Sequence, residues 1–393
     1  MMKQARPISV NDRITSIDTV RGIAILGIFL VNFPAMLGIQ PLDTRGYTQG
    51  ADAMFRFGYD LFIQTKFYSL FAFLFGLGFY LFMSRAEAKG YRMRALFSMR
   101  LAVLFLLGCL HFLLLWYGDI LHMYALVGFL LLFFYRQKAS ALFVWSIFLM
   151  ALFMLFIWFA FSGDIDLDQK VLLEAPWFNG LEDYAQKVSQ RYEMLSGIQI
   201  LNVIIYIPEL LGLFLLGLCA GKINFFQRVH EWKRGLRITQ IVSLVVTILL
   251  FIPMFRYYFS HEVYVSEEIQ KYIQLTGKTL FVFYLVSIVL LLENKRFRAK
   301  MQGFTYVGRM ALTNYLLQTL VTVLLFSLFI PNTAGIPLWI GFIFCITIYL
   351  LQIMFSKWWL SQYAFGPMEW LWRCATYMQK QPLRLKQQSR DRS

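Results

Sequence analysis

The sequence is poor in charge and lacks the residue patterns of common soluble enzymes. Only 15% of its 393 residues are Asp, Glu, Lys or Arg, whereas globular proteins carry about 25%. It has no GxSxG nucleophile elbow, no phosphate-binding P-loop, no HExxH zinc motif and no Gly-rich dinucleotide fingerprint. These absences exclude the familiar soluble hydrolases, NTPases and dehydrogenases.

Cysteine and histidine are scarce as well, with four residues of each. No two cysteines form a CxxC pair, and three of them lie inside apolar runs, so neither a disulfide framework nor a zinc site is expected. We predict no metal site and no tightly bound cofactor. The cysteines are Cys109, Cys219, Cys345 and Cys374.

Long apolar runs dominate what the sequence does contain. Hydrophobic residues make up 59% of the chain and aromatic residues 18%, and the mean hydropathy is +0.58. Ten runs have about the 20 residues that an α-helix needs to cross a bilayer. The sequence therefore predicts an all-α, polytopic transmembrane helical bundle of about ten spans. The predicted spans are 14–38, 60–83, 97–117, 119–135, 141–161, 199–220, 238–256, 276–292, 309–330 and 336–356.

Charge is distributed unevenly between the two sets of loops. The net charge is +15, and loops on the side of the N-terminus carry roughly three times as many Lys and Arg residues as the opposite loops. This bias predicts that both termini are cytoplasmic. It also explains the basic composition without nucleic acid, so membrane lipids are the expected partners. The first apolar run is too long for a cleavable signal peptide.

Two segments outside the spans have a character of their own. The outer loop 162–199 contains a predicted amphipathic helix, which is either a solvated connector or a lid over an outward-facing site. The chain after the transmembrane domain 1–356 forms a second unit, 357–393, with a Trp-rich helix and a basic tail. We expect that helix to lie on the inner leaflet or to fold under the bundle.

The first span carries polar residues where a span is normally apolar. Asp18 and Arg21 lie three residues apart on one helix face, and Asn32 follows near the outer end. One interpretation is an anchor that fixes the orientation of the span, with polar groups reaching the interface. The other is a face that lines a protein interior or a wet cavity.

His111 lies near the outer end of the third span, and Asp119 and His122 follow just beyond a tight turn. A single buried histidine is commonly a packing residue. A histidine beside a carboxylate has the parts of a general base and its orienting group. We therefore predict that His111 lies within about 8 Å of Asn32 or Asp119, around a cavity open to the outer side.

Other polar residues lie deeper in the spans. Glu209 follows a proline in the sixth span, where a carboxylate is expected to be neutral or paired with a cation. Asn314 and Gln318 are four residues apart and are positioned to hydrogen bond across helices. The GxxxG pattern at 217–221 favours close helix packing.

Four blocks of the sequence resemble the YeiB-like family of bacterial membrane proteins, a family defined by a domain of unknown function. The opening SIDTVRGIAILGIFLVNF carries the resemblance first, and the most specific block is GPMEWLWR at 366–373. The other two are KFYSLFAFLFGLGF at 66–79 and HFLLLWYGDILHMYALVG at 111–128. The resemblance implies a multi-pass protein of the bacterial cytoplasmic membrane.

That family is similar to transmembrane acyltransferases such as the heparan-glucosaminide N-acetyltransferases. Their acidic-x-x-Arg-Gly opening with a later asparagine matches Asp18, Arg21, Gly22 and Asn32. Those enzymes use a histidine just after the first span, whereas residues 33–60 contain none here. His111 is the residue that would replace it.

The resemblance implies transfer of an acyl group from a cytoplasmic thioester, acyl-CoA, to a hydroxyl or amine of an outer-face small molecule or glycan. His111 is then the base, oriented by Asp119, and Asn32 and Tyr117 are donors to the oxyanion. We assign Arg21 and Arg100 to the donor phosphates. Asp18 and His122 complete the predicted binding residues.

The alternative from a different class is a proton-coupled permease or exporter of a small metabolite, for which polar residues on several spans would form the relay. The sequence leaves the choice between a monomer and a homodimer open.

Overall fold

The structure is a computed structural model that describes residues 14–36, 49–162, 184–196, 198–329 and 336–385. Residues 163–183 of the predicted outer loop and 386–393 of the predicted basic tail lie outside these ranges. Within them the regular elements are helices, apart from an isolated bridge between Tyr363 and Arg384. In chain order the helices are α1 (Thr15–Met36), α2 (Gly50–Phe62), α3 (Lys66–Ala88), α4 (Met93–Leu114), α5 (Leu121–Phe134), α6 (Ala139–Ala160), α8 (Tyr184–Ser196), α9 (Ile198–Lys222), α10 (Lys233–Ser260), the 3₁₀ helix η2 (Ser266–Ile269), α11 (Gln270–Leu292), α12 (Lys295–Lys300), α13 (Gln302–Arg309), α14 (Ala311–Phe329), α15 (Leu338–Gln362) and α16 (Pro367–Tyr377).

Each of the ten predicted spans overlaps a helix. Eight helices in the described part of the chain are long and apolar enough to cross a membrane, and the bent pair α13 and α14 brings the number to nine. The remaining span is the apolar helix α5, which has 14 residues. The predicted all-α membrane bundle of about ten spans is therefore confirmed.

The second span contains a short break. The sequence placed this span at 60–83, which lies inside the candidate span from Gly50 to Ala88, where a turn at 63–65 separates α2 from α3. The buried Lys66 ammonium donates to the backbone oxygen of Asp60 over 2.7 Å. The Asp60 carboxylate accepts a hydrogen bond from Tyr264, also over 2.7 Å. Buried charged groups need such partners, and α2 and the segment between α10 and η2 supply them.

The ninth span is bent rather than continuous. The sequence placed it at 309–330, whereas α13 and α14 meet around Met310 at an angle of 86°. Glu369 of α16 accepts hydrogen bonds from the backbone N–H groups of Leu312 and Thr313, over 2.7 and 3.1 Å. A carboxylate in this position satisfies unpaired donors at a helix N-terminus and favours its dipole. The C-terminal helix therefore stabilises the start of α14.

Glycines let the central helices approach each other closely. Gly22 of α1 and Gly308 of α13 are placed so that a Cβ atom on either would collide with a backbone carbonyl of the other helix. Gly217 of α9 faces the carbonyl of Phe73 in α3 in the same way. The close packing predicted from the pattern at 217–221 is thus present at its first glycine.

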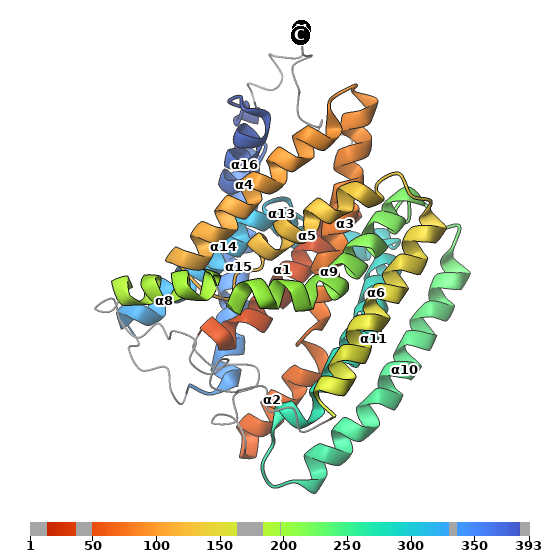
Figure 1. Cartoon of the computed structure of the whole chain (residues 1–393), viewed down its shortest axis with the longest axis vertical. Helices are drawn as coiled ribbons and strands as arrows, with labels where there is room; N and C mark the ends of the chain where they lie inside the picture. Colours follow the sequence, from red (N-terminus) through yellow and green to blue (C-terminus); the bar gives the residue numbers. More distant parts are fainter. Residues whose placement is uncertain (1–13, 37–48, 163–183, 197, 330–335, 386–393) are drawn as a thin grey trace.

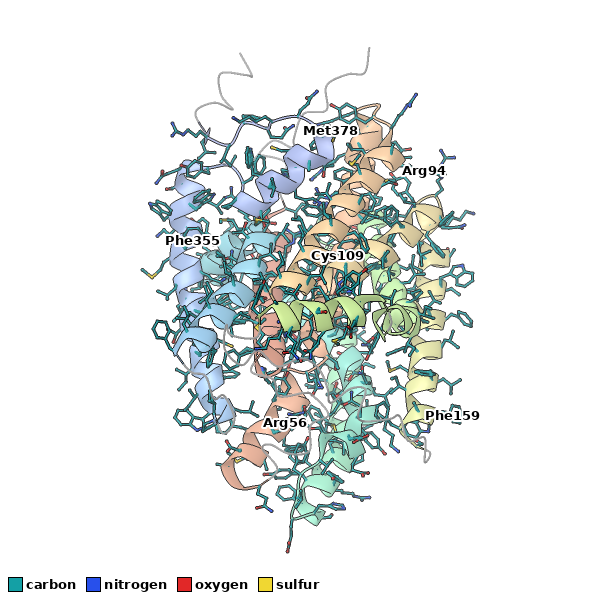
Figure 2. The ribbon with its side chains drawn as sticks, turned by 60° about the vertical axis from the view of Figure 1, so that its left-hand side comes forward. Arg56, Arg94, Cys109, Phe159, Phe355 and Met378 are labelled. Atoms are coloured by element: carbon teal, nitrogen blue, oxygen red, sulfur yellow. The ribbon has the colours of Figure 1, made fainter. Side chains whose placement is uncertain are left out.

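The helices run between two ends of an elongated bundle. Figure 2 shows Arg94, close to the start of α4, and Met378, just after α16, at one end, and Arg56 of α2 toward the other. We call the first of these the α16 end. The helices α1 and α4 begin toward this end, and α3 finishes there (Figure 1).

The predicted amphipathic helix corresponds to α8, which lies across the direction of its neighbours (Figure 1). Tyr184 donates to the backbone oxygen of Leu114 over 2.8 Å, and Arg191 donates to that of Leu113 over 3.1 Å. These carbonyls belong to the last turn of α4, where no intrahelical donor remains for them. α8 therefore covers the end of α4 that carries His111.

Candidate functional site

A tight turn between α4 and α5 brings three of the predicted site residues together. Gly108, one turn before His111, faces the start of α5. A Cβ atom there would lie 2.9 Å from a carboxylate oxygen of Asp119 and still closer to the backbone nitrogen of His122. Glycine at this position therefore allows α5 to fold back against α4.

One carboxylate binds both imidazoles. Nδ1 of His111 lies 2.9 Å from Oδ1 of Asp119, and Nδ1 of His122 lies 2.9 Å from Oδ2. The backbone N–H of His122 also donates to Oδ2 over 3.1 Å. None of the three residues is more than 3% exposed. The predicted proximity of His111 and Asp119 is present, and we call these three residues the His–Asp–His cluster.

This arrangement uses the Nδ1 atoms of His111 and His122 and leaves their Nε2 atoms unused. An Nδ1 atom that donates to a carboxylate leaves Nε2 of a neutral imidazole as an acceptor. Both Nε2 atoms are buried and have no hydrogen-bond partner among the described residues. An imidazole held by a carboxylate with its second nitrogen unused is the arrangement of a general base. Among the described residues, no group of three His, Cys, Asp or Glu side chains is arranged to hold a metal ion.

Tyr315 of α14 joins the cluster from a distant part of the chain. Its hydroxyl lies 3.5 Å from Oδ1 of Asp119, and its ring centroid lies 5.4 Å from that of His111. The residue is 3% exposed. The bend after α13 gives α14 the direction on which this contact depends.

A cavity of about 290 Å³ extends from the α16 end toward Tyr315. Its wall includes five arginines and two carboxylates, so it is suited to an anionic ligand. The opposite part of the wall is largely apolar, and includes Leu104, Leu121 and Tyr124 as well as Tyr315. The charged lining residues are Asp18, Arg21, Arg85, Arg100, Arg309, Glu369 and Arg373.

Several of these charged side chains are fixed by neighbours. Arg21 donates to Asp18 over 2.7 Å, which confirms that the two residues pair. The Arg100 guanidinium lies 3.5 Å from a ring centroid of Trp372, and the Trp372 indole donates to the backbone oxygen of Arg100 over 2.8 Å. Burial raises the pKa of the Glu369 carboxyl although hydrogen bonds oppose the shift.

The predicted site residues therefore fall into separate groups. His111, Asp119 and His122 form the cluster, whereas Asp18, Arg21 and Arg100 line the cavity. His122, which the sequence grouped with the binding residues, thus lies with the predicted base instead. Asn32 and Tyr117 belong to neither. The Tyr117 hydroxyl donates to the backbone oxygen of Ala35 over 3.4 Å. Among the described residues, no hydrogen bond joins Asn32 to the cluster.

The cavity of about 290 Å³ lies at the α16 end, where α1 and α4 begin. A cavity at the outer ends of the first and third spans, beside Asn32, stays a prediction. The sequence missed Arg85, Arg309 and Tyr315, because long-range packing brings them together. A usable signal existed for Glu369 and Arg373, since both lie in the block GPMEWLWR.

This geometry defines a polytopic helical membrane protein with a buried His–Asp–His cluster and an arginine-lined cavity. The family model described as "Protein of unknown function (DUF418)" matches residues 220–379. The chain is 33% identical to the protein YxaH of Bacillus subtilis, over 97% of this chain and 98% of that protein. The chain therefore belongs to the same family as YxaH.

Two further relatives cover the chain almost completely. A 39.9 kDa protein encoded in the amylase 3′ region of Bacillus acidopullulyticus is 32% identical, over 98% of this chain and 99% of its own length. The protein YeiB of Escherichia coli is 28% identical, over 93% of this chain and 96% of its own length. The predicted membership of a YeiB-like family is confirmed.

Proposed function

We propose that this protein is an integral membrane acyltransferase. It takes an acyl group from a thioester donor of the acyl-CoA type and passes it to a hydroxyl or amine acceptor. The proposal rests on one observation, that the arginine-lined cavity reaches a residue in contact with the His–Asp–His cluster. A cavity with five arginines in its wall reaches Tyr315, and Tyr315 contacts both His111 and Asp119.

The cavity suits a ligand with a charged head and a less polar arm. Arginine recognises phosphate oxygens through paired N–H donors, and the arginines lie on the part of the wall at the α16 end. The apolar part of the wall reaches Tyr315 and would face the arm. In the proposal the donor's phosphates remain among the arginines while its thioester reaches Tyr315.

The His–Asp–His cluster supplies the base. The acceptor hydroxyl or amine attacks the thioester carbonyl carbon while Nε2 of His111 takes its proton. Asp119 stabilises the imidazolium through the Nδ1 hydrogen bond. Collapse of the tetrahedral intermediate breaks the C–S bond, and the imidazolium returns the proton to the leaving thiolate. His122 keeps Asp119 in position through two further hydrogen bonds.

The acceptor has to approach His111 from elsewhere than the donor. Nε2 of His111 is buried, and α8 covers the neighbouring end of α4. We propose that α8 moves to admit the acceptor, which makes it a lid rather than a connector. With both termini cytoplasmic, the donor enters from the cytoplasm of a bacterial cell and the acceptor from the outer face of the inner membrane.

A permease is the second candidate, and one observation favours it. Lys278 of α11 donates to Glu209 of α9 in the interior of the bundle, and the Glu209 side chain is only 2% exposed. Ion pairs inside membrane-spanning helices commonly mark ion or proton pathways. A permease would move its solute between sealed compartments and would leave a thioester intact.

Thioester consumption in detergent separates the two candidates. Purified protein is incubated with acetyl-CoA and a cell-envelope extract as a source of acceptors, and the free thiol of CoA is measured. We expect thiol release without any sealed compartment, and a loss of at least about 100-fold in His111→Gln. His230→Gln, which changes an exposed histidine, is the control. If the wild-type protein releases no CoA from acetyl-, butyryl- or palmitoyl-CoA, the proposal is wrong.

A further inference from the structure

We propose that Tyr315 is a catalytic residue, whose phenol donates a hydrogen bond to the thioester carbonyl oxygen as it becomes an oxyanion. This inference rests on the proposed acyl transfer and adds to it a residue that the sequence did not single out. It starts from the position of the side chain, which belongs to both the cavity and the cluster.

Tyr315 lies where the donor arm and the base must meet. Among the described residues of the cavity wall, Tyr315 has a side chain that hydrogen bonds to the His–Asp–His cluster. Leu121 also lines the cavity and is next to His122 in the chain, but its side chain has no polar atom. A thioester that enters along the apolar wall therefore meets the phenol before it reaches His111.

The hydrogen bond that the Tyr315 hydroxyl donates to Asp119 is weak. Its 3.5 Å length is well beyond the usual 2.7–2.8 Å of an O–H···O bond. Asp119 already accepts two bonds of 2.9 Å from the histidines. A small rotation of the phenol toward a nearby oxyanion would exchange a long bond for a shorter one. Such donors stabilise transition-state charge most effectively in a dry site, and Tyr315 is 3% exposed.

The other candidates for this task are placed elsewhere. The Tyr117 hydroxyl is directed to the backbone oxygen of Ala35, and Asn32 has no hydrogen bond to the cluster among the described residues. Neither residue is part of the cavity wall. The oxyanion therefore needs a donor from another helix, and α14 provides it.

With Tyr315 included, every proton and electron pair in the reaction is accounted for. The acceptor's O–H or N–H proton goes to Nε2 of His111 as the new C–O or C–N bond forms. The C=O π electrons move onto oxygen, where the phenol of Tyr315 donates without giving up its proton. They return as the C–S bond breaks, and the thiolate takes the proton from His111. Tyr315 thus lowers the barrier and is unchanged at the end.

The test is the kinetics of Tyr315→Phe in the full-length protein, with acetyl-CoA as the donor. We expect kcat to fall about 100-fold, the usual effect of losing one oxyanion donor, while KM for acetyl-CoA changes less than about twofold. The control is Tyr349→Phe, which removes another buried hydroxyl, one that donates to the backbone oxygen of Gly22 over 2.7 Å. The control should keep the wild-type kcat.

The outcomes separate this inference from the proposed function. No CoA release by the wild type overturns the acyltransferase itself. An active wild type with an equally active Tyr315→Phe overturns only the role of Tyr315, as does a rise in KM at constant kcat. If Tyr315→Phe does not fold, difluorotyrosine at 315 keeps the ring and lowers the phenol pKa. The fall of kcat at alkaline pH should then begin at a lower pH in this variant than in the wild type. An unshifted pH profile of kcat overturns the inference.

Discussion

Two of the buried groups of polar side chains in the bundle are built on different principles. In one, Lys278 of α11 donates to Glu209 of α9 and to Ser69 of α3, so that opposite charges are matched one to one. In the other, a single carboxylate, Asp119, binds two imidazoles and leaves their Nε2 atoms without partners. The first group joins helices, whereas the second retains unused basic nitrogens.

The difference indicates that the first group serves folding and the second serves a reaction. A buried ion pair is satisfied by its own partners, and removal of one partner leaves an uncompensated charge. A buried acceptor without a partner costs stability that packing must offset. Such a group calls for an explanation, and a ligand or proton that uses it is the one proposed for the two imidazoles. We therefore expect substitutions in the first group to alter folding and substitutions in the second to alter activity.

The largest expected effect is that of Asp119→Asn on acyl transfer. The amide keeps the shape of the side chain but cannot hold both imidazoles as donors or stabilise an imidazolium. By analogy with serine-protease triads, kcat should fall about 10⁴-fold, or roughly 5 kcal/mol in barrier height. The measurement is CoA release at saturating acetyl-CoA, with Glu231→Gln in an exposed ion pair as the control. Wild-type turnover in Asp119→Asn would remove the distinction between the two groups.

Next is the ion pair, where Lys278→Met should reduce stability by about 3–5 kcal/mol. The loss arises because the Glu209 carboxylate remains buried without a cation. Thermal unfolding in detergent, followed by size-exclusion chromatography, measures it. The double variant Lys278→Met with Glu209→Leu should recover most of the loss, since no charge then remains. A single variant that unfolds at the wild-type temperature would show that the pair is not structural.

The smallest effect is expected in the cavity wall, with Arg373→Gln. Loss of one charge-assisted hydrogen bond to a phosphate is worth about 1.5 kcal/mol. KM for acetyl-CoA should therefore rise about tenfold while kcat stays close to the wild-type value. Arg237→Gln, at an exposed position near the start of α10, is the matched control. An equal KM in both variants would mean that the donor does not contact this wall.

The sequence predicted local features of this architecture well. The spans follow from apolar runs, and the cluster follows from three residues that are close in the chain and separated by one tight turn. Glu209 was expected to be neutral or paired, and the pairing with Lys278 is confirmed. Asn314 and Gln318 hydrogen bond to Ser356 and Gln352 of α15, as their spacing predicted.

Features that depend on tertiary packing could not be predicted in this way. Glu369, more than fifty residues away in the chain, stabilises the start of α14 just after the bend. That bend orients the helix that brings Tyr315 to Asp119. The cavity collects arginines from α1, α3, α4, α13 and α16, and hydropathy does not indicate which faces of these helices meet. The sequence accordingly indicated Arg21 and Arg100 but not Arg85 or Arg309.

The central claim is that the arginine-lined cavity holds the donor with its carbonyl at Tyr315. The most direct measurement is a cryo-EM map of the protein with the acetonyl analogue of acetyl-CoA, in which a methylene replaces the thioester sulfur. We predict density for the phosphates among Arg100, Arg309 and Arg373, and a ketone oxygen within about 3.5 Å of the Tyr315 hydroxyl. Density for the analogue outside the cavity, or with its ketone directed away from the cluster, would contradict the account.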